Sequence, residues 1–242
     1  MTSTLFVSDL HLDASRPEIT RQLLDFLGTR ARVADAVYIL GDLFEAWIGD
    51  DDDAPLGNAV MDGLRACVDS GTPVHIMQGN RDFLIGTQFA VRTGCRLLGD
   101  PARINLCGSP TLLMHGDTLC TDDAEYLAFR AQVRDPRWQQ AFLRQSTDTR
   151  RKIAGDLRAT SRTRVAEKPE TIGDVNQETV VRVMTEHGVQ QLIHGHTHRP
   201  AIHEMEVAGR PARRIVLGDW YRQGSLLECT PQGCRLWGLR TD

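Results

Sequence analysis

Five short apolar runs, each ending in polar and chemically versatile side chains, constrain the fold of this chain most strongly. They cover residues 5–7, 36–40, 74–77, 112–114 and 191–193. Short runs of this kind, closed by glycine and polar residues, are typical of buried β-strands. Stretches with helical spacing lie between them, over residues 18–30, 56–70 and 175–187. Alternating strands and helices predict an α/β layered fold whose functional residues lie beyond the carboxyl ends of the strands.

The bulk composition is that of an ordinary globular domain. Of the 242 residues, 41% are hydrophobic and 25% are charged, so we expect a single domain over residues 1–242 with a sizeable core. We see no signal peptide, and no apolar run approaches the ~18 residues of a membrane-spanning helix. The six cysteines lie far apart without a C-x-x-C pair, which favours free thiols in a reducing cytoplasm over disulfides.

Near the C-terminus the predicted strands are no longer separated by helices. Residues 214–217, 225–229 and 234–237 alternate with turn residues alone. We interpret this stretch as an antiparallel β layer, which could form a second sheet packed on the first.

Charge is distributed unevenly along the chain. Residues 118–174 are too many for a simple connection and show helical spacing, so we expect a helical insertion at about 120–172. Residues 130–168 contain eleven Lys/Arg and four Asp/Glu, so this segment carries about +7 while the whole chain carries −4. This favours a lid over an anionic, partly apolar substrate, with a solvated excursion that only supports the fold as the alternative. An acidic run at residues 50–53 is interpreted as a solvated loop or, alternatively, as a cation-binding loop.

The polar clusters after the apolar runs supply oxygen and imidazole ligands for divalent cations. The candidate ligands are Asp9, His11, Asp42, Asn80, His115, His196 and His198. Carboxylate, amide and imidazole donors without thiolates suit Mn²⁺, Fe²⁺, Mg²⁺ or Zn²⁺. Because strand side chains repeat every two residues, D-x-H and H-x-H spacing predicts that both side chains of each motif lie on one face. Each motif alone is weak, but five in series predict one metal centre.

The order of these motifs, D-x-H, G-D-x-x-E, G-N-R-D, H-G-D and G-H-T-H, resembles the calcineurin-like metallophosphoesterase superfamily. The resemblance implies a four-layer α/β/β/α sandwich, in which the β-rich tail fits as the second sheet. It also implies two metal ions, one of them bound by Asp9, His11 and His198. The other would be bound by Asn80, His115 and His196. Asp42 would bridge the two, because a carboxylate has two oxygens and can serve two cations.

Arg81 departs from the superfamily pattern, which has a histidine after the asparagine. A histidine there can protonate a leaving oxygen, whereas a guanidinium stays charged and grips phosphate. This suits a phosphate leaving group, which departs without a proton because its second pKa lies near ~6. The substitution therefore favours cleavage of a pyrophosphate. The catalytic residues implied by the resemblance are Asp42, Asn80, Arg81 and His115.

Longer strings, among them residues 38–51, 79–84, 114–123 and 194–200, resemble one family within this superfamily. That family acts in lipid A biosynthesis of Gram-negative bacteria and hydrolyses the pyrophosphate bond of the lipid-linked UDP-sugar UDP-2,3-diacylglucosamine. The resemblance implies two Mn²⁺ ions, water attack on the α-phosphorus, and release of UMP and 2,3-diacylglucosamine 1-phosphate. It also implies a cytoplasmic enzyme that associates peripherally with the inner membrane.

The same resemblance implies a set of substrate contacts. They are Asn80, Arg81, Asp123, Tyr126, Ser161, Lys168 and His196. Val165 stands where the family has a small polar residue, so Thr163 or Arg164 beside it would substitute.

Several of these interpretations leave alternatives. Tyr126 could be a packing residue of the insertion, and Asp123 or Ser161 could cap a helix. Glu45 fills a position where the superfamily usually has aspartate, and it could orient a metal ligand or pair with a basic neighbour. A soluble dinucleotide hydrolase would not need an apolar insertion, and a non-catalytic module would show broken ligand positions. Because the excess of basic residues lies in one segment, we expect no nucleic-acid partner, and no obligate protein partner is evident.

Overall fold

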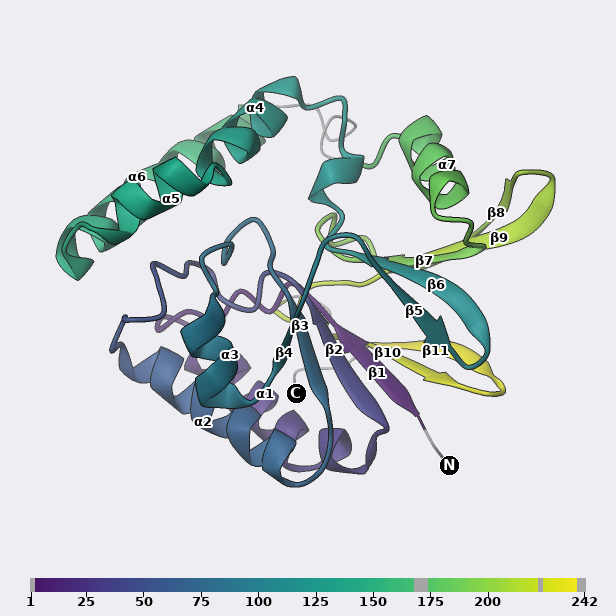
Figure 1. The fold of residues 1–242 in the computed structure, drawn as a ribbon, viewed down its shortest axis with the longest axis horizontal. Helices are drawn as coiled ribbons and strands as arrows, with labels where there is room; N and C mark the ends of the chain where they lie inside the picture. Colours follow the sequence, from purple (N-terminus) through teal and green to yellow (C-terminus); the bar gives the residue numbers. More distant parts are fainter. Residues whose placement is uncertain (1–2, 168–173, 222–223, 239–242) are drawn as a thin grey trace.

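The computed structural model describes residues 3–167, 174–221 and 224–238, and the side chains of all of these except 162–167. Within them, two sheets pack face to face (Figure 1). The first has the strand order β11-β10-β1-β2-β3-β4. Its strands are β1 (Thr4–Val7), β2 (Ala36–Leu40), β3 (Val74–Met77), β4 (Arg96–Leu98), β10 (Ser225–Thr230) and β11 (Gly233–Gly238). The second has the order β5-β6-β7-β9-β8, with β5 (Ala102–Leu106), β6 (Ser109–Met114), β7 (Gln191–His194), β8 (Ala201–Val207) and β9 (Arg210–Val216).

Helices cover the outer face of each sheet (Figure 1). The first sheet carries α1 (Pro17–Gly28), α2 (Pro55–Asp69) and α3 (Thr87–Thr93), and the second carries α7 (Gln177–Glu186). Both α1 and α2 begin with a proline, whose fixed φ suits the first turn of a helix. The three helices expected from apolar spacing thus correspond to α1, α2 and α7, whereas α3 is short and carried no such signal.

Apolar side chains fill the layers between these elements. On α1, Ile19, Leu23 and Phe26 are buried along one face, as helical periodicity requires. Side chains of both sheets, such as Phe6 of β1 and Ile193 of β7, form a further buried layer between the sheets. The four-layer α/β/β/α sandwich is therefore confirmed.

The C-terminal strands do not form one layer, contrary to the prediction. β9 pairs antiparallel with β8 and parallel with β7, where Gln191 lies opposite Arg213. β10 and β11 instead extend the first sheet, because β10 pairs antiparallel with β1 and Cys229 lies opposite Thr4. The second sheet is accordingly built on β6 and β7 rather than on the tail alone. Periodicity identifies a strand but does not indicate the sheet edge with which it pairs.

Cys229 and Cys234 form a disulfide across the β10–β11 hairpin, so the expectation of six free thiols was wrong. The two residues lie opposite each other in the antiparallel register, which brings their side chains together on one face. Their spacing carried no signal because the pairing depends on the turn between the strands. The remaining cysteines, 67, 95, 107 and 120, are thiols.

Three helices stand apart from the sandwich, above the edge where β1, β2 and β3 end (Figure 1). They are α4 (Ala124–Val133), α5 (Pro136–Leu143) and α6 (Thr147–Glu167), and we call them the cap helices. They occupy the stretch in which an insertion is predicted; the limits of that insertion, about 120–172, and the single-domain organisation stay predictions. None of the helices in the described part of the chain is long and apolar enough to pass through a lipid bilayer.

Candidate metal centre

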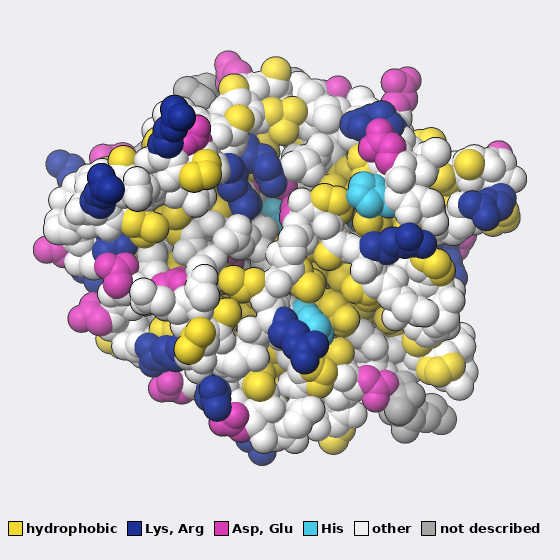
Figure 2. All heavy atoms as spheres, in the orientation of Figure 1, with side chains coloured by type: hydrophobic (Ala, Val, Ile, Leu, Met, Phe, Trp, Pro, Cys, Tyr) yellow, Lys and Arg dark blue, Asp and Glu magenta, His cyan; other side chains and the backbone are white. Residues whose placement is uncertain are grey.

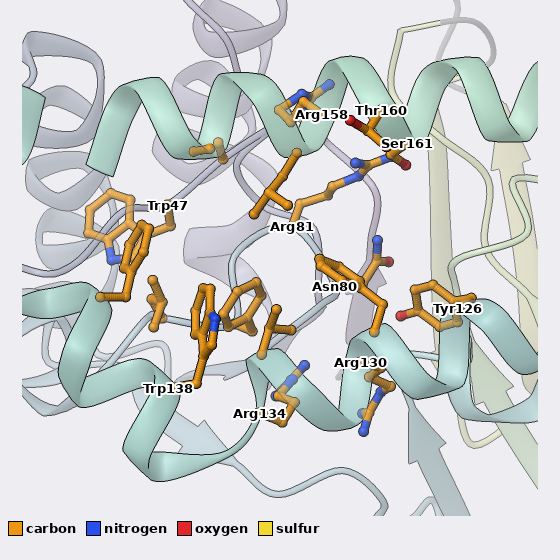
Figure 3. A pocket seen from close by; sticks show the side chains of 18 of the residues that line it. Trp47, Asn80, Arg81, Tyr126, Arg130, Arg134, Trp138, Arg158, Thr160 and Ser161 are labelled. Atoms are coloured by element: carbon orange, nitrogen blue, oxygen red, sulfur yellow. The ribbon is translucent and has the colours of Figure 1, made fainter. Parts of the chain in front are cut away.

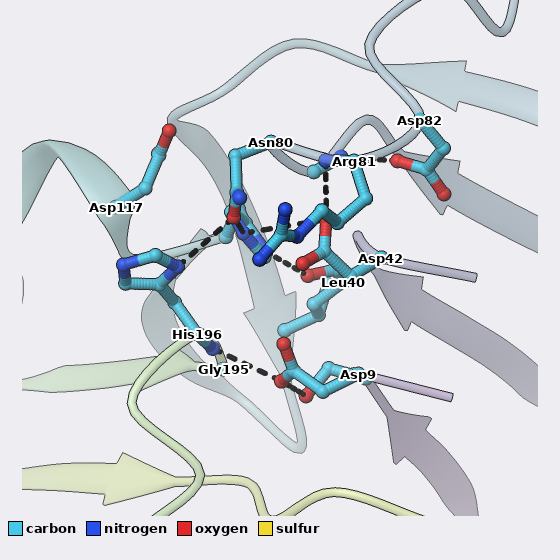
Figure 4. Close-up of polar contacts among 12 residues, drawn as sticks. Asp9, Leu40, Asp42, Asn80, Arg81, Asp82, Asp117, Gly195 and His196 are labelled. Carbon is cyan, nitrogen blue, oxygen red and sulfur yellow. Dashed lines mark hydrogen bonds and ion pairs between the residues drawn. The ribbon is translucent and has the colours of Figure 1, made fainter. Parts of the chain in front are cut away.

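Loops that follow five strands meet at one edge of the sandwich, and the structure brings the seven predicted metal ligands together there. The ligands follow β1 (Asp9, His11), β2 (Asp42), β3 (Asn80), β6 (His115) and β7 (His196, His198). Because the carboxyl ends of parallel strands share an edge, residues far apart in the sequence become neighbours. Figure 4 shows Asp9, Asp42, Asn80 and His196 converging on this edge.

One half of the cluster contains Asp9, His11 and His198. The Nε2 atoms of the two histidines lie 3.2 Å apart, and His198 Nε2 lies 3.3 Å from Asp9 Oδ1. These three side chains are close enough together to share one cation. Asp9 Oδ1 is buried and accepts no hydrogen bond from the described residues, a deficit that a cation would satisfy.

The other half contains Asn80, His115 and His196. Asn80 Oδ1 lies 2.8 Å from His115 Nε2 and 3.0 Å from His196 Nδ1. Asp42 lies between the halves, because its Oδ2 is 3.6 Å from His11 Nε2 and its Oδ1 is 3.8 Å from His115 Nε2. Asp42 thus presents one carboxylate oxygen to each half.

An oxygen atom lies close to the second ring nitrogen of two of these histidines, in a hydrogen bond at His115 and at ion-pair distance at His11. His11 Nδ1 lies 2.8 Å from Glu45 Oε2, and His115 Nδ1 lies 2.9 Å from the backbone oxygen of Leu40. A proton kept on each Nδ1 would leave the Nε2 lone pair to bind a metal, which is the tautomer that such a site requires. Glu45 therefore lies against a predicted ligand, and it also forms an ion pair with Arg158, so both alternatives that the sequence left open are present in the structure.

Five of the seven predicted ligands have a left-handed backbone conformation. The φ angles are +55° at Asp9, +47° at His11, +52° at Asp42, +69° at His196 and +55° at His198. Such a conformation costs a residue other than glycine on the order of 1 kcal/mol, and it clusters at functional sites. The expectation that strand alternation aligns D-x-H and H-x-H was wrong, because β1 ends at Val7 and β7 at His194, before either motif. Loops with left-handed residues present these side chains instead.

Two glycines allow the loops to approach the ligands closely. A Cβ on Gly79 would lie 2.1 Å from Asp42 Oδ1, so no side chain fits there. Gly41 has a φ of +89°, and a Cβ on it would lie 2.5 Å from His115 Nδ1. The packing of the cluster therefore requires glycine at both positions.

Burial and neighbouring charges perturb ionisation inside the cluster. Burial, reinforced by the charge of His115, lowers the pKa of His196 to about 4. Burial alone would also lower the pKa of His115, but the carboxylates of Asp42 and Asp117 outweigh it and raise that pKa to about 9. Burial would raise the pKa of Asp9, yet the neighbouring histidines hold it below its usual value. Ionised carboxylates beside imidazoles form a donor set that fits a divalent cation.

Comparison with known proteins shows the family to which the chain belongs. A family model for calcineurin-like phosphoesterases matches residues 2–200. A protein of Cellvibrio japonicus (strain Ueda107) named UDP-2,3-diacylglucosamine hydrolase is 53% identical over 234 residues, 97% of this chain and 98% of its own. A protein of the same name from Stenotrophomonas maltophilia (strain K279a) is 52% identical, over 99% of this chain and 98% of its own. The chain belongs to the UDP-2,3-diacylglucosamine hydrolase family.

One solved structure, described as a novel archaeal phosphodiesterase, matches 98% of this chain and 100% of its own with a TM-score of 0.52. Its sequence identity to this chain is 12%, so the likeness shows the fold alone. Divalent metal binding is a property of the metallophosphoesterase family to which the chain belongs, and the clustered carboxylates and histidines provide for it.

In this member of the UDP-2,3-diacylglucosamine hydrolase family, a cavity of about 260 Å³ lies between the cap helices and the metal cluster (Figure 3). Its walls include five of the predicted substrate residues, namely Asn80, Arg81, Asp123, Tyr126 and Ser161. His196 lies next to Tyr126, with ring centroids 6.0 Å apart. The side chain of Arg164 and the whole of Lys168 lie outside the residues that the structure describes.

One end of this cavity is aromatic. Trp138 stacks on Phe142 with ring centroids 5.1 Å apart, and Phe83 lies 6.1 Å from Trp138. We call these three residues the aromatic recess. In Figure 3, Trp138 lies on the opposite side of the cavity from Asn80. Figure 2 shows basic and apolar side chains together around the hollow beneath the cap helices, so one cavity combines a charged and an apolar end.

Several arginines of the cap helices contact the core. Arg130 Nε donates to Asp117 Oδ2 at 2.6 Å, beside the H-G-D motif. Arg134 Nη2 donates to the backbone oxygen of Gly79 at 2.8 Å, next to Asn80. Part of the basic charge that predicts a lid for an anionic substrate is therefore used to fix the cap helices over the metal cluster.

The acidic run, residues 50–53, is partly exposed to solvent and partly bound to other segments of the chain. Asp50 accepts two backbone N–H groups at the start of α3. Asp51 and Asp52 pair with Arg150 and Arg151 of α6, with oxygen to nitrogen distances of 2.7 and 2.6 Å. The interpretation as a solvated loop therefore holds for part of the run, because Asp53 stays exposed. The partners of Asp51 and Asp52 lie about a hundred residues further along the chain, and the sequence carried no indication of them. A cation-binding role stays an untested alternative.

Two buried aspartates beside the cluster are important in the structure, although sequence reasoning did not name them. Asp82 accepts the N–H of Gly79 at 2.7 Å and also binds the backbone that follows Asp42, so it joins two ligand loops. Burial, with the charge of Asp42, raises the pKa of Asp82 to about 6. Asp117 accepts the hydroxyl of Tyr126 at 2.5 Å. Asp82 and Asp117 are the last residues of the G-N-R-D and H-G-D motifs, and this position could have identified them from the sequence.

Proposed function

We propose that this chain hydrolyses UDP-2,3-diacylglucosamine at its pyrophosphate bond, giving UMP and 2,3-diacylglucosamine 1-phosphate (lipid X). The observation that carries the proposal is the single cavity that joins Arg81, beside the candidate metal centre, to the aromatic recess at Trp138. A substrate with a pyrophosphate at one end and acyl chains at the other has the polarity of this cavity. The names of the relatives, which match almost the whole chain, support the same substrate.

The proposed cofactors are two Mn²⁺ ions. The proposed ligands of one ion are Asp9, His11 and His198. Those of the other are Asn80, His115 and His196, with Asp42 bridging the two. When bound, such ions supply an acidified water and positive charge beside the phosphoryl oxygens. The chain contributes preorganisation, because the loop conformations and the hydrogen bond between His115 Nδ1 and the backbone oxygen of Leu40 hold the ligands in place before the substrate binds.

Arg81 is proposed to bind the phosphate on the leaving side. Its backbone N–H donates to Asp42 Oδ1 at 2.8 Å, which places the residue beside the cluster. Its Nε is buried without a hydrogen-bond partner among the described residues, which suits a group that awaits an anionic ligand. Water attack on the α-phosphorus expels a sugar phosphate, and this group needs no proton at the moment of departure. An arginine in place of the usual histidine is consistent with that chemistry.

The remaining substrate contacts are proposals of the same kind. They are Asn80, Asp123, Tyr126, Ser161, Arg164, Lys168 and His196. Asp123 also caps α4 by accepting the N–H of Tyr126, and the hydroxyl of Tyr126 donates to Asp117. The alternative roles of these two residues in the cap helices are therefore present in the structure, and contact with the sugar would be additional.

We place the enzyme at the cytoplasmic face of the inner membrane of a Gram-negative bacterium, as a peripheral protein. The reason is the proposed substrate, whose acyl chains keep it in a bilayer until it enters the cavity. We propose neither a nucleic-acid partner nor an obligate protein partner.

The test compares two substrates. The purified chain with Mn²⁺ is incubated with UDP-2,3-diacylglucosamine in mixed micelles and, separately, with a soluble dinucleoside polyphosphate, and nucleotide release is followed by chromatography. We expect UMP from the lipid substrate, and a loss of at least ~100-fold in the His115→Ala variant with an unchanged circular dichroism spectrum. Rapid hydrolysis of the dinucleotide without turnover of the lipid would contradict the proposal.

A further inference from the structure

Glu45 and His11 lie on two loops that run side by side at the metal cluster. Leu12 and Phe44 form an isolated parallel bridge, and the N–H of Glu45 donates to the backbone oxygen of Leu12 at 3.1 Å. This pairing places Glu45 Oε2 2.8 Å from His11 Nδ1. The side chains are 20% and 6% exposed, respectively, so water competes little for this contact.

Arg158 of α6 holds Glu45 from the side of the cap helices. Its Nη1 donates to the backbone oxygen of Glu45, and its Nη2 forms an ion pair with Glu45 Oε1. The Arg158 side chain is itself only 15% exposed. One carboxylate oxygen of Glu45 thus faces a predicted metal ligand while the other faces a cap helix.

We propose that Glu45 and Arg158 are positioning residues that make metal affinity at the His11 half of the cluster depend on the docking of α6. Glu45 fixes the ring of His11 so that its Nε2 points at Asp9 and Asp42, and Arg158 fixes Glu45. The inference rests on the proposed function only in taking His11 as a metal ligand. Neither positioning residue needs to touch the substrate for the coupling to operate.

Charge and position predict opposite effects of removing Arg158. Arg158 is a cation near a cation site, so its removal would by Coulomb's law favour metal binding. Positioning predicts weaker binding, because Glu45 loses the partner that fixes its carboxylate against His11. Partners that orient a ligand typically contribute 10- to 100-fold to metal affinity, by order of magnitude. The direction of the change therefore separates the two accounts.

The test is a Mn²⁺ titration of the metal-free full chain, in which free Mn²⁺ is followed by electron paramagnetic resonance without any substrate. For Glu45→Gln we expect about 10- to 100-fold weaker binding at one of two sites, and for Arg158→Ala a loss of about 10-fold at the same site. The double variant should bind no more than about twofold more weakly than Glu45→Gln, because the two residues act through the same contact.

Arg151→Ala is the matched control. Arg151 lies on the same helix and pairs with Asp52 of the core at 2.6 Å, but it touches no predicted ligand. Its removal should leave the Mn²⁺ titration unchanged. Should Arg158→Ala fail to fold, Arg158→Gln retains part of the aliphatic stem and is expected to weaken binding in the same direction.

Unchanged or tighter Mn²⁺ binding in a folded Arg158→Ala or Arg158→Gln variant would overturn the inference. That result would leave the proposed function intact, because hydrolysis of the lipid by the unaltered chain is measured independently. Conversely, weaker Mn²⁺ binding in the variants of a chain that fails to hydrolyse the lipid would support the coupling and reject only the proposed substrate.

Discussion

Arg81 lies where the metal cluster meets the cavity, and its main chain and side chain have separate contacts. The backbone N–H binds Asp42, whereas the side chain lines the cavity with a buried Nε that lacks a partner among the described residues. This separation means that the side chain can be changed without removing the contact to the carboxylate. The residue is therefore a suitable position at which to examine phosphate binding apart from metal binding.

We expect Arg81→Ala to lower kcat/KM for the lipid substrate by about 100- to 1000-fold, the usual effect of removing a preorganised donor to developing negative charge. Affinity for Mn²⁺ should stay within about twofold, because the guanidinium is not a ligand. Steady-state kinetics and a metal titration provide the two measurements. A loss below ~10-fold, or an equally large loss of Mn²⁺ affinity, would show that the role given to Arg81 is incorrect.

At the scale of residues, the sequence predicted which side chains lie together, but not the backbone conformation that presents them. Asp9, Asp42 and His115 each follow an apolar run, and the carboxyl ends of parallel strands share an edge, so their meeting was predictable. Their exact presentation was not, because left-handed φ angles at aspartate and histidine depend on the loops packed against them. The contacts of Glu45 with His11 and Arg158 likewise join loops that are separate in the sequence.

The cap helices are fixed to the sandwich by arginines on α4 and on α6. Near the start of α6, Arg150 is 1% exposed and donates to the backbone oxygen of Ile48 as well as to Asp51. The next residue, Arg151, makes an exposed pair with Asp52. Adjacent arginines on one helix therefore form one buried and one exposed link to the same acidic run.

Removal of Arg150, the buried link, should destabilise the fold more than removal of Arg151, the exposed link. We expect Arg150→Ala to lower the free energy of unfolding by about 1–3 kcal/mol, because a charged hydrogen-bond network is lost from a buried position. Arg151→Ala should cost less than about 1 kcal/mol, since exposed ion pairs contribute little. Urea denaturation of both variants measures the difference. Equal effects of the two substitutions would contradict the assignment of Arg150 as the anchor.

At the scale of elements, periodicity was informative where a helix or strand is long and has one buried face. Helices α1, α2 and α7 and the strands before the five polar clusters were predicted for that reason. The pairing of β10 with β1, and with it the disulfide between Cys229 and Cys234, was not. Such pairings depend on which sheet edge is open, and this is a property of the assembled fold rather than of any segment.

The whole molecule combines a sandwich, which carries the metal cluster, with cap helices that complete the cavity. The segment from residue 130 to residue 168 carries an excess of positive charge. Part of this charge contacts the core, through residues such as Arg130 and Arg134. The aromatic recess at Trp138 uses side chains from both parts. Selectivity for a lipid substrate is therefore expected to reside in the contact between cap and core.

Removal of the Trp138 side chain from the aromatic recess should lower the turnover of acylated substrates only. We expect Trp138→Ala to lower kcat/KM for UDP-2,3-diacylglucosamine by about 10- to 100-fold, because burial of a large apolar group is worth about 1.5–3 kcal/mol. Turnover of UDP-glucosamine, which has no acyl chains, should change less than about threefold. Competition between the two substrates in one reaction gives the ratio directly, and an equal loss for both would place Trp138 in the fold rather than in recognition.

The most direct test of the central claim is hydrolysis of UDP-2,3-diacylglucosamine with Mn²⁺ in ¹⁸O-labelled water, followed by mass spectrometry of both products. Attack on the α-phosphorus, with Arg81 gripping the departing phosphate, predicts that the label appears in UMP and that the sugar 1-phosphate remains unlabelled. Label in 2,3-diacylglucosamine 1-phosphate would contradict the account, because it would place the attacked phosphorus on the other side of the bridging oxygen.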